Sequence, residues 1–485
     1  MTDTSSRDDP NIVLFVMDTM RAGGTVPADP ALTPNLAALA ASGAEYTNTF
    51  ATAPWTLPSH VSLFTGTYPS KHGACGDHTY FDGSLPTIVD AFADAGYETA
   101  GVSNNVWITD EFGATDGFDV FRDDSKRTDA WSGAGGWGHR ATNAVRRSRF
   151  GGPTFEWLRR HLTVGDESDN GAAATVDWAA EWLADRDSDD PFFFFANCIE
   201  PHLEYRPPPS FARDFLPDGW SYDRAMSLRQ DPREFDVGAF DYTEEEWDVV
   251  KSLYHAEIAY LDAQVGRLQA VLEAAGEWED TVFVALSDHG ENVGEHGLLG
   301  HQYSLFDTVL HVPLVVHGGD FSANHVRTDR LVQTADLAPT LLDAAGIDAP
   351  ELREASQALS FHPTEGTEPR SQVIAEYMRP QPAIEVLEEK FDHVPDELYE
   401  YQRSLRAVRT NGYKYVRGSD GTEWLYDVRE DPGERHDISA ASPRQTADLA
   451  TALDTWLGSF DEADTVGSVE VSDATEDRLA DLGYL

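Results

Sequence analysis

A chain of 485 residues exceeds one ordinary hydrophobic core, and 41% of these residues are hydrophobic. We therefore expect a large packed domain with a smaller one beside it. The 85 acidic residues outnumber the 35 basic ones and give a net charge of −50. This charge argues against nucleic-acid binding, which needs a positive surface to displace counterions. The acidic residues are spread along the whole chain, which is typical of proteins from a high-salt cytoplasm, as in haloarchaea.

Cysteine content and the N-terminal residues narrow the class of protein further. Only two cysteines occur, Cys75 and Cys198, so the sequence predicts neither a disulfide framework nor a cysteine metal cluster. The first ten residues are polar and acidic, and the apolar run at residues 12–17 is too short for a membrane span or a signal peptide. We expect a cytoplasmic protein that binds neither membranes nor nucleic acid.

Strand and helix patterns alternate over the first 370 residues. The strand patterns, mostly continuous apolar runs, lie at residues 12–17, 100–103, 192–196, 282–286 and 312–316. The helical patterns lie at residues 33–43, 86–95, 172–184 and 243–275. The last of these begins with a capping box formed by Thr243 and Glu246. The alternation predicts an α/β fold whose largely parallel sheet is covered by helices on both faces.

The sequence changes in character after about residue 370. Residues 407–416 and 424–428 are typical of short antiparallel strands, with Asn-Gly and Asp-Gly hairpin turns. A helical pattern follows at residues 445–457. We predict a catalytic α/β domain at residues 1–370 and a smaller α+β subdomain with an antiparallel sheet at residues 371–485.

Two segments, residues 121–170 and 204–240, are rich in Gly, Pro, Arg and Asp and show weak periodicity. We expect them to be loop insertions around a site. The first contains a cluster of basic residues: Arg140, Arg146, Arg147, Arg149, Arg159 and Arg160. We interpret this cluster as a solvated helix face or as a contact with another acidic surface. The alternative hypothesis is that it holds the anionic part of a large substrate.

Polar side chains that can bind a metal follow three of the predicted strands. Asp18 follows the first strand, Glu200 and His202 follow the third, and Asp288 and His289 follow the fourth. Ligands of open α/β sheets bind beyond the carboxyl ends of the strands, so these side chains can converge. Carboxylate oxygens and imidazole nitrogen suit a divalent cation. One aspartate after a strand is more often a cap, but three coincidences favour a site.

A fourth segment, TLPSH at residues 56–60, adds a hydroxyl group. Pro58 fits a first helical turn, which places Thr56 at or just before a helix N-terminus. Free backbone N–H groups and the helix dipole favour an anion there. A hydroxyl held beside a metal at that place is able to attack phosphorus or sulfur. Taken alone, the segment is better explained by Thr56 or Ser59 capping the helix.

In this order along the chain, the segments resemble the sulfatases of the alkaline phosphatase superfamily. The matching segments are NIVLFVMDTMR (residues 11–21), PWTLPSHVSLFTGTYPSKHG (54–73), GFD (117–119), EPHLEYRP (200–207), SDHGENVGEHGLLG (287–300), residues 330–339, YKY (413–415) and LYD (425–427). The resemblance implies a large, mostly parallel sheet flanked by helices, with a small C-terminal α+β subdomain. It also implies one divalent metal ion and a small anionic ester as substrate.

The resemblance assigns a role to each candidate site residue. The implied metal ligands are Asp18, Thr56, Asp288 and His289. Thr56 occupies the position of the nucleophile, and His202 lies in the segment that supplies a histidine near the leaving group. His301 stands where the family usually has a lysine that contacts the substrate's anionic oxygens. The implied substrate-binding residues are His60, Asn104, Asn105 and His301.

Departures from the family pattern bear on the chemistry. Formylglycine sulfatases carry Cys or Ser in a C-x-P-S-R motif, whereas this chain has Thr56 and His60 at its ends. Threonine cannot be oxidised to an aldehyde because its β-carbon carries a methyl group, so we expect no formylglycine and an unmodified Thr56. Unmodified threonine nucleophiles occur in the related nucleotide phosphodiesterases and in phosphoethanolamine transferases.

Other departures remove fixed positive charge or change the ligands. Thr19 replaces a second aspartate, Asp288-His289 replaces an Asp-Asn pair, and Asn104 and Asn105 replace a lysine-x-histidine pair. A histidine ligand makes Mn²⁺ or Zn²⁺ plausible beside Ca²⁺ and Mg²⁺. A second metal on His202 or His301 is the less favoured arrangement.

These observations predict a metal-dependent hydrolase of sulfate or phosphate esters. Phosphodiester or phosphonate ester cleavage is slightly preferred on the mechanism, because the formylglycine motif is absent. Two alternatives stay open. One is a phospho- or sulfo-group transferase acting on glycan or lipid-linked acceptors, and the other is an inactive homologue that binds an anion.

Overall fold

The computed structural model describes residues 9–22, 31–125, 169–322, 327–366, 368–463, 469 and 471–481. Within these residues, a mixed sheet of nine strands has the order β11-β2-β10-β6-β1-β5-β3-β4, with β9 paired to β2. Its strands are β1 (Asn11–Met17), β2 (Ala44–Phe50), β3 (Glu98–Ser103), β4 (Val120–Asp123), β5 (Phe192–Cys198), β6 (Thr281–Leu286), β9 (His311–Val312), β10 (Leu314–His317) and β11 (Arg327–Gln333). Neighbouring strands from β6 to β4 run parallel, whereas β10 runs antiparallel to β6 and β2.

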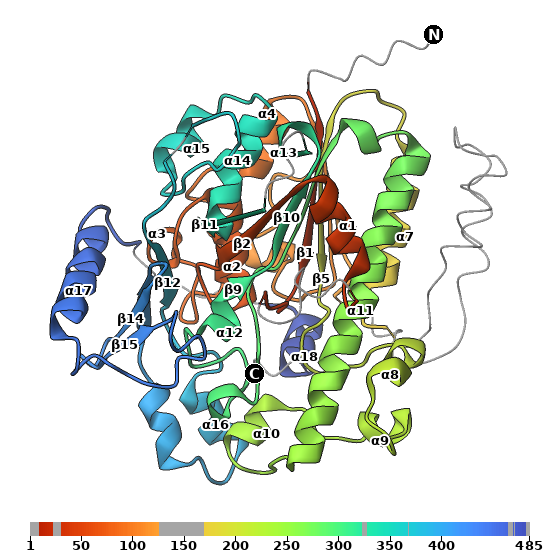
Figure 1. Cartoon of the computed structure of the whole chain (residues 1–485). Coiled ribbons are helices and arrows are strands. Elements are labelled where there is room, and N and C mark those ends of the chain that lie inside the picture. The colour runs from red at the N-terminus through yellow and green to blue at the C-terminus, as the bar shows by residue number, and fades with distance from the viewer. Residues whose placement is uncertain are drawn as a thin grey trace.

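Helices cover both faces of the sheet (Figure 1). Those of the first half are α1 (Pro34–Ser42), α2 (Thr56–Thr65), α3 (Pro69–His72), α4 (Ile88–Asp94), α7 (Ala172–Asp185), α8 (Pro209–Phe215), α9 (Tyr222–Met226) and α10 (Pro232–Asp236). Those of the second half are α11 (Glu244–Ala275), α12 (Asp307–Leu310), α13 (Gly319–Ser322), α14 (Leu337–Ala344), α15 (Pro350–Ala355), α16 (Ile384–Lys390), α17 (Pro443–Leu457) and α18 (Asp473–Asp481). Helices α2, α4 and α14 pack on one face, and α1, α7 and α11 on the other. The predicted α/β fold is confirmed.

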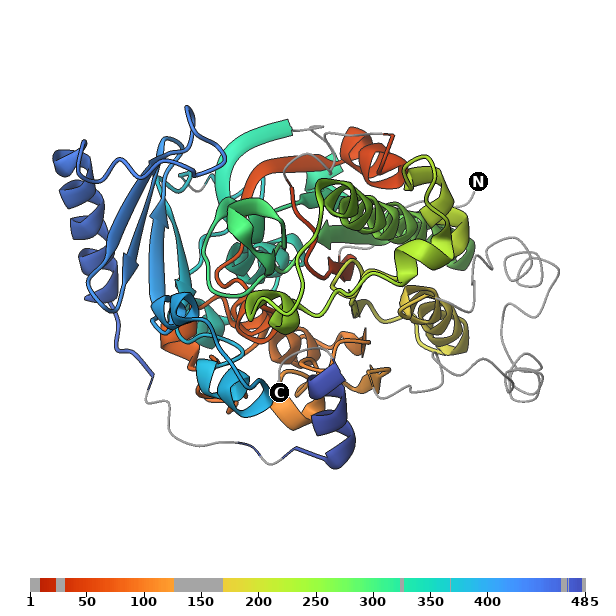
Figure 2. The same ribbon diagram turned by 90° about the horizontal axis from the view of Figure 1, so that it is seen from below.

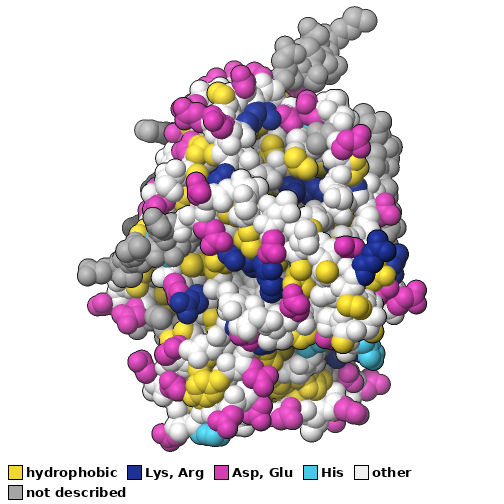
Figure 3. Space-filling model, turned by 90° about the vertical axis from the view of Figure 1, so that its left-hand side faces the viewer, with side chains coloured by type: hydrophobic (Ala, Val, Ile, Leu, Met, Phe, Trp, Pro, Cys, Tyr) yellow, Lys and Arg dark blue, Asp and Glu magenta, His cyan; other side chains and the backbone are white. Residues whose placement is uncertain are grey.

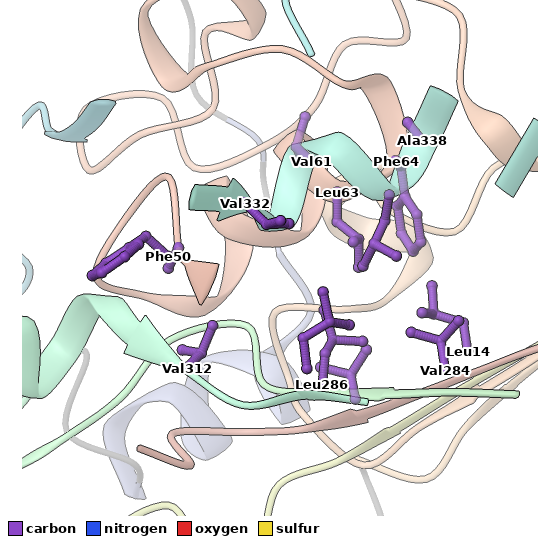
Figure 4. Close-up of a cluster of buried hydrophobic side chains, with 14 of the residues drawn as sticks. Leu14, Phe50, Val61, Leu63, Phe64, Val284, Leu286, Val312, Val332 and Ala338 are labelled. Carbon is purple, nitrogen blue, oxygen red and sulfur yellow. The ribbon is translucent and has the colours of Figure 1, made fainter. Parts of the chain in front are cut away.

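Strand β1 lies in the middle of the sheet and is buried along its whole length. Successive side chains of a strand point to opposite faces, so a strand covered on both faces must be apolar throughout. Leu14 accordingly belongs to one hydrophobic core and Phe15 to the other. Figure 4 shows the first of these cores, where Leu14 and Val284 lie beneath Phe64 of α2.

The strand expected at residues 312–316 is divided in the structure. Strand β9 ends at Val312 and pairs with β2, whereas β10 begins at Leu314 and pairs with both β2 and β6. Pro313 separates them because proline has no N–H group to donate to a ladder. The prediction of a single strand was therefore wrong at this point.

The second of the expected loop segments also differs. Residues 204–240 contain α8, α9 and α10, which have only seven, five and five residues. Helices this short cannot display a 3.6-residue hydrophobic period, so the prediction of loops was wrong for a physical reason. In the first segment, the arginine cluster between Arg140 and Arg160 lies outside the described residues.

A small sheet forms the C-terminal part of the fold and is antiparallel throughout, as predicted. Its strands are β12 (Val373–Tyr377), β13 (Leu405–Arg409), β14 (Tyr413–Gly418) and β15 (Glu423–Asp427). Leu449 and Leu453 of α17 pack on one of its faces, and Figure 2 shows this sheet and α17 to the left of the large sheet. The domain boundary at residue 370 stays a prediction.

The face that carries α17 shows how charge is distributed at the surface. Acidic side chains are scattered over this whole face, with smaller groups of Lys and Arg between them (Figure 3). Among the described helices, none combines the length and the apolar composition needed to cross a lipid bilayer.

A buried ion-pair network joins the small sheet to α12. The ammonium group of Lys414, on β14, lies 2.9 Å from Asp307 Oδ1 and 2.7 Å from Glu434 Oε1, and its side chain is fully buried. Burial alone would raise the pKa of Asp307, but the charges of Lys414 and Arg409 hold it below its ordinary value.

We expect Lys414→Met to lower the free energy of unfolding by about 3–5 kcal/mol, because it leaves two buried carboxylates without their shared cation. Urea unfolding at neutral pH measures this loss. Lys251→Met, at an exposed lysine of α11, is the control and should change stability by less than about 0.5 kcal/mol. Equal stability of the two variants would contradict the structural role of this network.

Candidate metal centre and active site

The carboxyl ends of two adjacent parallel strands, β1 and β6, bring the predicted metal ligands Asp18, Asp288 and His289 together. Asp18 follows β1, which lies between β5 and β6, and Asp288 and His289 follow β6. One ligand atom from each of these three residues lies within 4.8 Å of the other two, and all three residues are buried. The structure thus forms the cluster that the sequence predicted at this edge of the sheet.

Each carboxylate of the cluster has one oxygen held by the protein and one without a partner. Asp288 Oδ1 accepts from the backbone N–H of His289 at 2.8 Å and of Thr19 at 3.4 Å. Asp18 Oδ2 accepts from Asn105 Nδ2. Asp18 Oδ1 and Asp288 Oδ2 are buried and have no hydrogen-bond partner. A buried oxygen without a partner is costly unless a positive charge meets it.

The electrostatics of the cluster also favour a bound cation. Burial and the charge of Asp288 raise the pKa of Asp18 well above its ordinary value. Burial also raises the pKa of Asp288 to about 8. Two ionised carboxylates in this place repel each other in the absence of a cation. The two oxygens without partners and the repulsion between their carboxylates therefore fit a divalent cation.

His289 is arranged to serve as a neutral ligand. Its Nδ1 lies 3.0 Å from the carbonyl oxygen of Gly290, so the Nδ1–H group donates there and Nε2 is left as an electron-pair donor. Nε2 lies 3.5 Å from both Asp18 Oδ1 and Asp288 Oδ2. Burial lowers the pKa of His289 well below its ordinary value, which keeps the ring neutral.

Thr56 is the first residue of α2, as Pro58 predicted. Trp55 before it has an extended backbone, with φ −150° and ψ 164°, and the helix turns directly after it. The buried Thr56 Oγ1 lies 3.5 Å from His289 Nε2 and 3.3 Å from Asn105 Nδ2. The hydroxyl therefore lies beside the cluster and at the positive end of a helix.

The two neighbouring asparagines after β3 face different surroundings. Asn105 contacts both Asp18 and Thr56, as described above. Asn104 instead donates to the carbonyl oxygen of Asn170 at 3.0 Å and accepts from the N–H of Ile199 at 2.7 Å. The structure brings Asn105 to the cluster, whereas the amide of Asn104 is occupied in holding neighbouring loops.

His60 lies behind the cluster, one helical turn after Thr56. Its Nδ1 donates to the carbonyl oxygen of Thr56 at 2.9 Å and lies 3.4 Å from Asp288 Oδ2. Burial lowers its pKa to about 4, so the ring is neutral at pH 7. His60 therefore does not replace the positive charge of the arginine that this position has in the resembling motif.

Two further histidines line the cluster. The ring of His301 lies 4.6 Å from that of His289 and 5.1 Å from that of His202, measured between centroids. Burial is the main cause that lowers the pKa of His202 to about 4. His202 Nδ1 contacts the carbonyl oxygen of Leu203, so a neutral His202 has no proton to give from Nε2.

A glutamate that sequence reasoning missed completes this side of the site. Glu291 Oε1 lies 2.9 Å from His301 Nδ1, and both side chains are buried. The other oxygen of Glu291 accepts from the N–H of Leu203 at 3.3 Å and from the hydroxyl of Tyr205 at 3.4 Å. A carboxylate at Nδ1 fixes the orientation and the tautomer of an imidazole. The sequence feature that could have indicated Glu291 is its position in the segment SDHGE, two residues after His289.

His296 has a structural role in the turn that connects β7 (Asn292–Val293) and β8 (Leu299–Gly300). Its ring stacks on Phe306 with centroids 3.5 Å apart, and its backbone has φ 57°.

Comparison with known proteins agrees with this fold. Among family models, the one described as Sulfatase matches residues 10–347, and the one described as N-sulphoglucosamine sulphohydrolase, C-terminal, matches residues 294–461. The matched residues include every member of the cluster and Thr56. The chain belongs to the sulfatase family, whose enzymes use a divalent metal ion.

Curated relatives match over most of their length. The chain is 28% identical over 472 residues to a choline-sulfatase of Rhizobium meliloti (strain 1021), covering 91% of this chain and 84% of that protein. It is 25% identical over 487 residues to arylsulfatase K of Bos taurus, covering 92% and 81%. Both names denote sulfatases.

Solved structures share the fold at lower identity. The phosphonate monoester hydrolase of Agrobacterium radiobacter has a TM-score of 0.66 at 22% identity, over 92% of this chain and 95% of that one. A 2-O GAG sulfatase has the same TM-score at 20% identity, over 93% and 92%. At these identities the likeness shows the fold alone, and it confirms the large sheet with a small C-terminal antiparallel sheet.

Proposed function

We propose that this chain hydrolyses small anionic esters of sulfate or phosphate, with unmodified Thr56 as the nucleophile. The observation that carries this proposal is the position of Thr56 Oγ1, at the N-terminus of α2 and 3.5 Å from His289 of the cluster. Asp18, Asp288 and His289 would hold the divalent cation, with Thr56 beside it. When bound, the cation would lower the pKa of the hydroxyl and polarise an ester oxygen.

The chain's own groups then supply the remaining steps. The Thr56 oxygen attacks phosphorus or sulfur in line, and the bond to the leaving oxygen breaks. The backbone N–H groups at the start of α2 favour the charge that develops on the other oxygens. Water then attacks the same atom and gives a proton to His301, which has lost its own to the leaving oxygen, and Thr56 is released as the ionised oxygen that began the reaction.

We assign the proton for the leaving oxygen to His301 rather than to His202. Glu291 orients His301 and can stabilise its charged form, as the aspartate does for the histidine of a serine-protease triad. Neutral His202 lies next to His301, with ring centroids 5.1 Å apart. We slightly prefer phosphodiesters or phosphonate esters as substrates, because Thr56 cannot form the formylglycine of sulfate-ester hydrolases.

A panel of aryl esters tests the proposal. It contains a sulfate, a phosphate monoester, a phosphate diester and a phosphonate ester, each assayed in high salt with Ca²⁺, Mg²⁺, Mn²⁺ or Zn²⁺. We expect turnover that depends on the metal and is fastest with the phosphate diester or the phosphonate. Fastest cleavage of the sulfate would reverse our preference for phosphorus. Product formed only with an added alcohol would indicate a transferase, and anion binding without turnover an inactive homologue.

Glu291→Gln tests the assignment of His301. It keeps the size of the side chain but removes the charge that orients the ring, so we expect kcat to fall about 10- to 100-fold. The loss should be larger for esters with poor leaving groups, because these need the proton most.

Glu376→Gln is the matched control. Glu376 is a buried glutamate of β12, in the small sheet, and it accepts from Ser70 N–H and Arg406 rather than from a histidine. Its substitution should lower stability but leave the dependence of the rate on the leaving group as in the wild type. The same sensitivity to the leaving group in wild type and Glu291→Gln would remove His301 from this role.

A further inference from the structure

The backbone turns sharply directly after Asp18 of the cluster. Thr19 has φ 59°, in the left-handed region that a β-branched residue rarely adopts. Such a strained conformation persists only where the surrounding structure holds it in place. The turn also presents the N–H group of Thr19 to Asp288 Oδ1, at 3.4 Å. Its shape therefore affects both carboxylates of the cluster, since Asp18 precedes the turn and Asp288 accepts from it.

A tyrosine of the long helix α11 holds this turn. The hydroxyl of Tyr254 donates to the carbonyl oxygen of Thr19 at 2.9 Å and accepts from the N–H group of Arg21 at 3.1 Å. One side chain thus bridges two backbone groups of the turn. Thr19 and Tyr254 are both fully buried. Loss of this hydroxyl would take from a buried carbonyl oxygen its donor, which is costly in a protein interior.

The ring of Tyr254 is fixed by contacts that do not involve its hydroxyl. It packs against the ring of Tyr205, with centroids 5.2 Å apart, and the guanidinium of Arg21 lies over it at 5.5 Å from the centroid. Helix α11 runs along one face of the sheet (Figure 1), and Tyr254 belongs to the hydrophobic core on that face. The hydroxyl is therefore carried by a well-packed element, as a group that positions others requires.

A serine joins the same turn to the segment that carries the other metal ligands. The hydroxyl of Ser287 accepts from the N–H group of Met20 at 2.9 Å and donates to the carbonyl oxygen of His289 at 2.6 Å. It therefore links the turn after β1 to the segment after β6. Tyr254 adds a link from this pair of segments to the layer of helices. The two hydroxyls together hold consecutive backbone groups of the turn.

We propose that Tyr254 is a positioning residue of the metal centre, and that its hydroxyl keeps the Thr19 turn in the conformation that binds the cation. The hydroxyl acts through the backbone of Thr19 and Arg21 rather than on the cation itself. Without it, the strained Thr19 can relax towards a negative φ, and its N–H group then leaves Asp288. The two carboxylates are no longer held for one cation, so the affinity for metal falls. This inference rests on the proposed function, in which the cluster holds that cation.

Tyr254→Phe tests the inference, because it keeps the packed ring and removes only the hydroxyl. The metal-free wild type is titrated in a calorimeter with Ca²⁺, Mg²⁺, Mn²⁺ and Zn²⁺, and the cation that binds most tightly is used for the variants. We expect Tyr254→Phe to raise the Kd of this cation about 10- to 100-fold, as the loss of an outer hydrogen-bond partner does at other metal sites.

Tyr260→Phe is the matched control. Tyr260 lies on the same helix and is fully buried, and its hydroxyl donates to Asp169 instead of to the turn. Its substitution should lower the thermal unfolding temperature in EDTA but leave the Kd as in the wild type. Binding of metal is thus measured without relying on the rate of the loaded enzyme.

Thr19→Gly separates positioning from a general loss of stability. Glycine adopts a positive φ about as readily as a negative one, so the turn then depends less on the hydroxyl. We expect Tyr254→Phe to raise the Kd by a smaller factor in the Thr19→Gly background than in the wild-type background. Equal factors in the two backgrounds, or an unchanged Kd in Tyr254→Phe, would overturn the inference and leave the proposed function intact. Absence of metal binding by the wild type would overturn both.

Discussion

Thr56→Ala should lower kcat by about 10⁴-fold or more, because it removes the atom that attacks the ester. The contacts of the hydroxyl with Asn105, at 3.3 Å, and with His289, at 3.5 Å, are long for hydrogen bonds. Its loss should therefore change the thermal unfolding temperature little. Thr56→Ser keeps an attacking oxygen and should retain much more activity than Thr56→Ala. Steady-state assays with the best ester of the panel measure these rates.

The control for this prediction is Thr65→Ala, the same substitution at the other end of α2. The Thr65 hydroxyl is buried and bonds to the carbonyl oxygen of Val61 and to Thr67. Its removal should cost stability and leave kcat near the wild-type value. Mass spectrometry of a rapidly quenched reaction should find the phosphoryl or sulfuryl group on the peptide that contains Thr56. Turnover by Thr56→Ala at the wild-type rate would mean that water attacks the ester directly.

The central part of the fold was predictable because burial of a strand on both faces requires a continuous apolar run in the sequence. β1, β5 and β6 are covered by helices on both sides, so their residues form continuous apolar runs. The direction of β10 was not predictable in the same way. The apolar pattern of a buried strand is the same for a parallel and for an antiparallel strand. Only the pairing of β10 with β6 and β2 shows that it is antiparallel.

Elements with little apolar surface escaped prediction. Strand β2 has the sequence AEYTNTF, in which polar residues interrupt the pattern, although most of the strand is buried. Helix α18 is strongly acidic, and it is held mainly by Leu479, Thr475 and the bonds between Ser472 and Glu111. Contacts between distant parts of the chain stabilise such elements, and no local pattern reports those contacts.

The candidate site was predictable where position along a strand or helix decides it. Asp18, Asp288 and His289 follow buried strands, and Pro58 places Thr56 at a helix start. Side-chain direction within a loop was not predictable. Asn104 and Asn105 are chemically identical neighbours, and the backbone after β3 turns only Asn105 towards Asp18. The catalytic and binding roles of all these residues stay predictions until variants are assayed.

Asp18→Asn should separate the metal site from the stability of the fold. At neutral pH the metal-free wild type keeps two buried carboxylates close together, and both have raised pKa values. A raised pKa of an acid means that its ionised form opposes folding, so this cost grows as the pH rises above the ordinary pKa and is full above the raised one; neutral pH lies between the two, where part of the cost is present. Asp18→Asn removes one charge, and the metal-free variant should be at least as stable as the metal-free wild type.

Addition of metal should reverse that order. A cation that binds only the folded wild type stabilises it by about 2.7 kcal/mol at a concentration of 100 times its Kd. Asp18→Asn lacks one of the two charged ligands, so it should gain much less, and its kcat should fall at least about 10³-fold. Thermal unfolding with EDTA and with each metal measures both effects on the same samples.

Asp262→Asn is the control because it changes a buried aspartate away from the site. Asp262 on α11 accepts from the N–H groups of Asn35 and Leu36 at the start of α1, at 3.0 and 2.8 Å. Replacing one carboxylate oxygen by an amide group opposes these donors, so stability should fall equally with and without metal. An equal response to metal in Asp18→Asn and wild type would show that Asp18 is not a ligand. Without metal, Asp18→Asn should be at least as stable as the wild type, whereas with metal it should be less stable. Asp262→Asn should be less stable than the wild type in both conditions, so a general loss of stability can be told apart from the loss of the metal site.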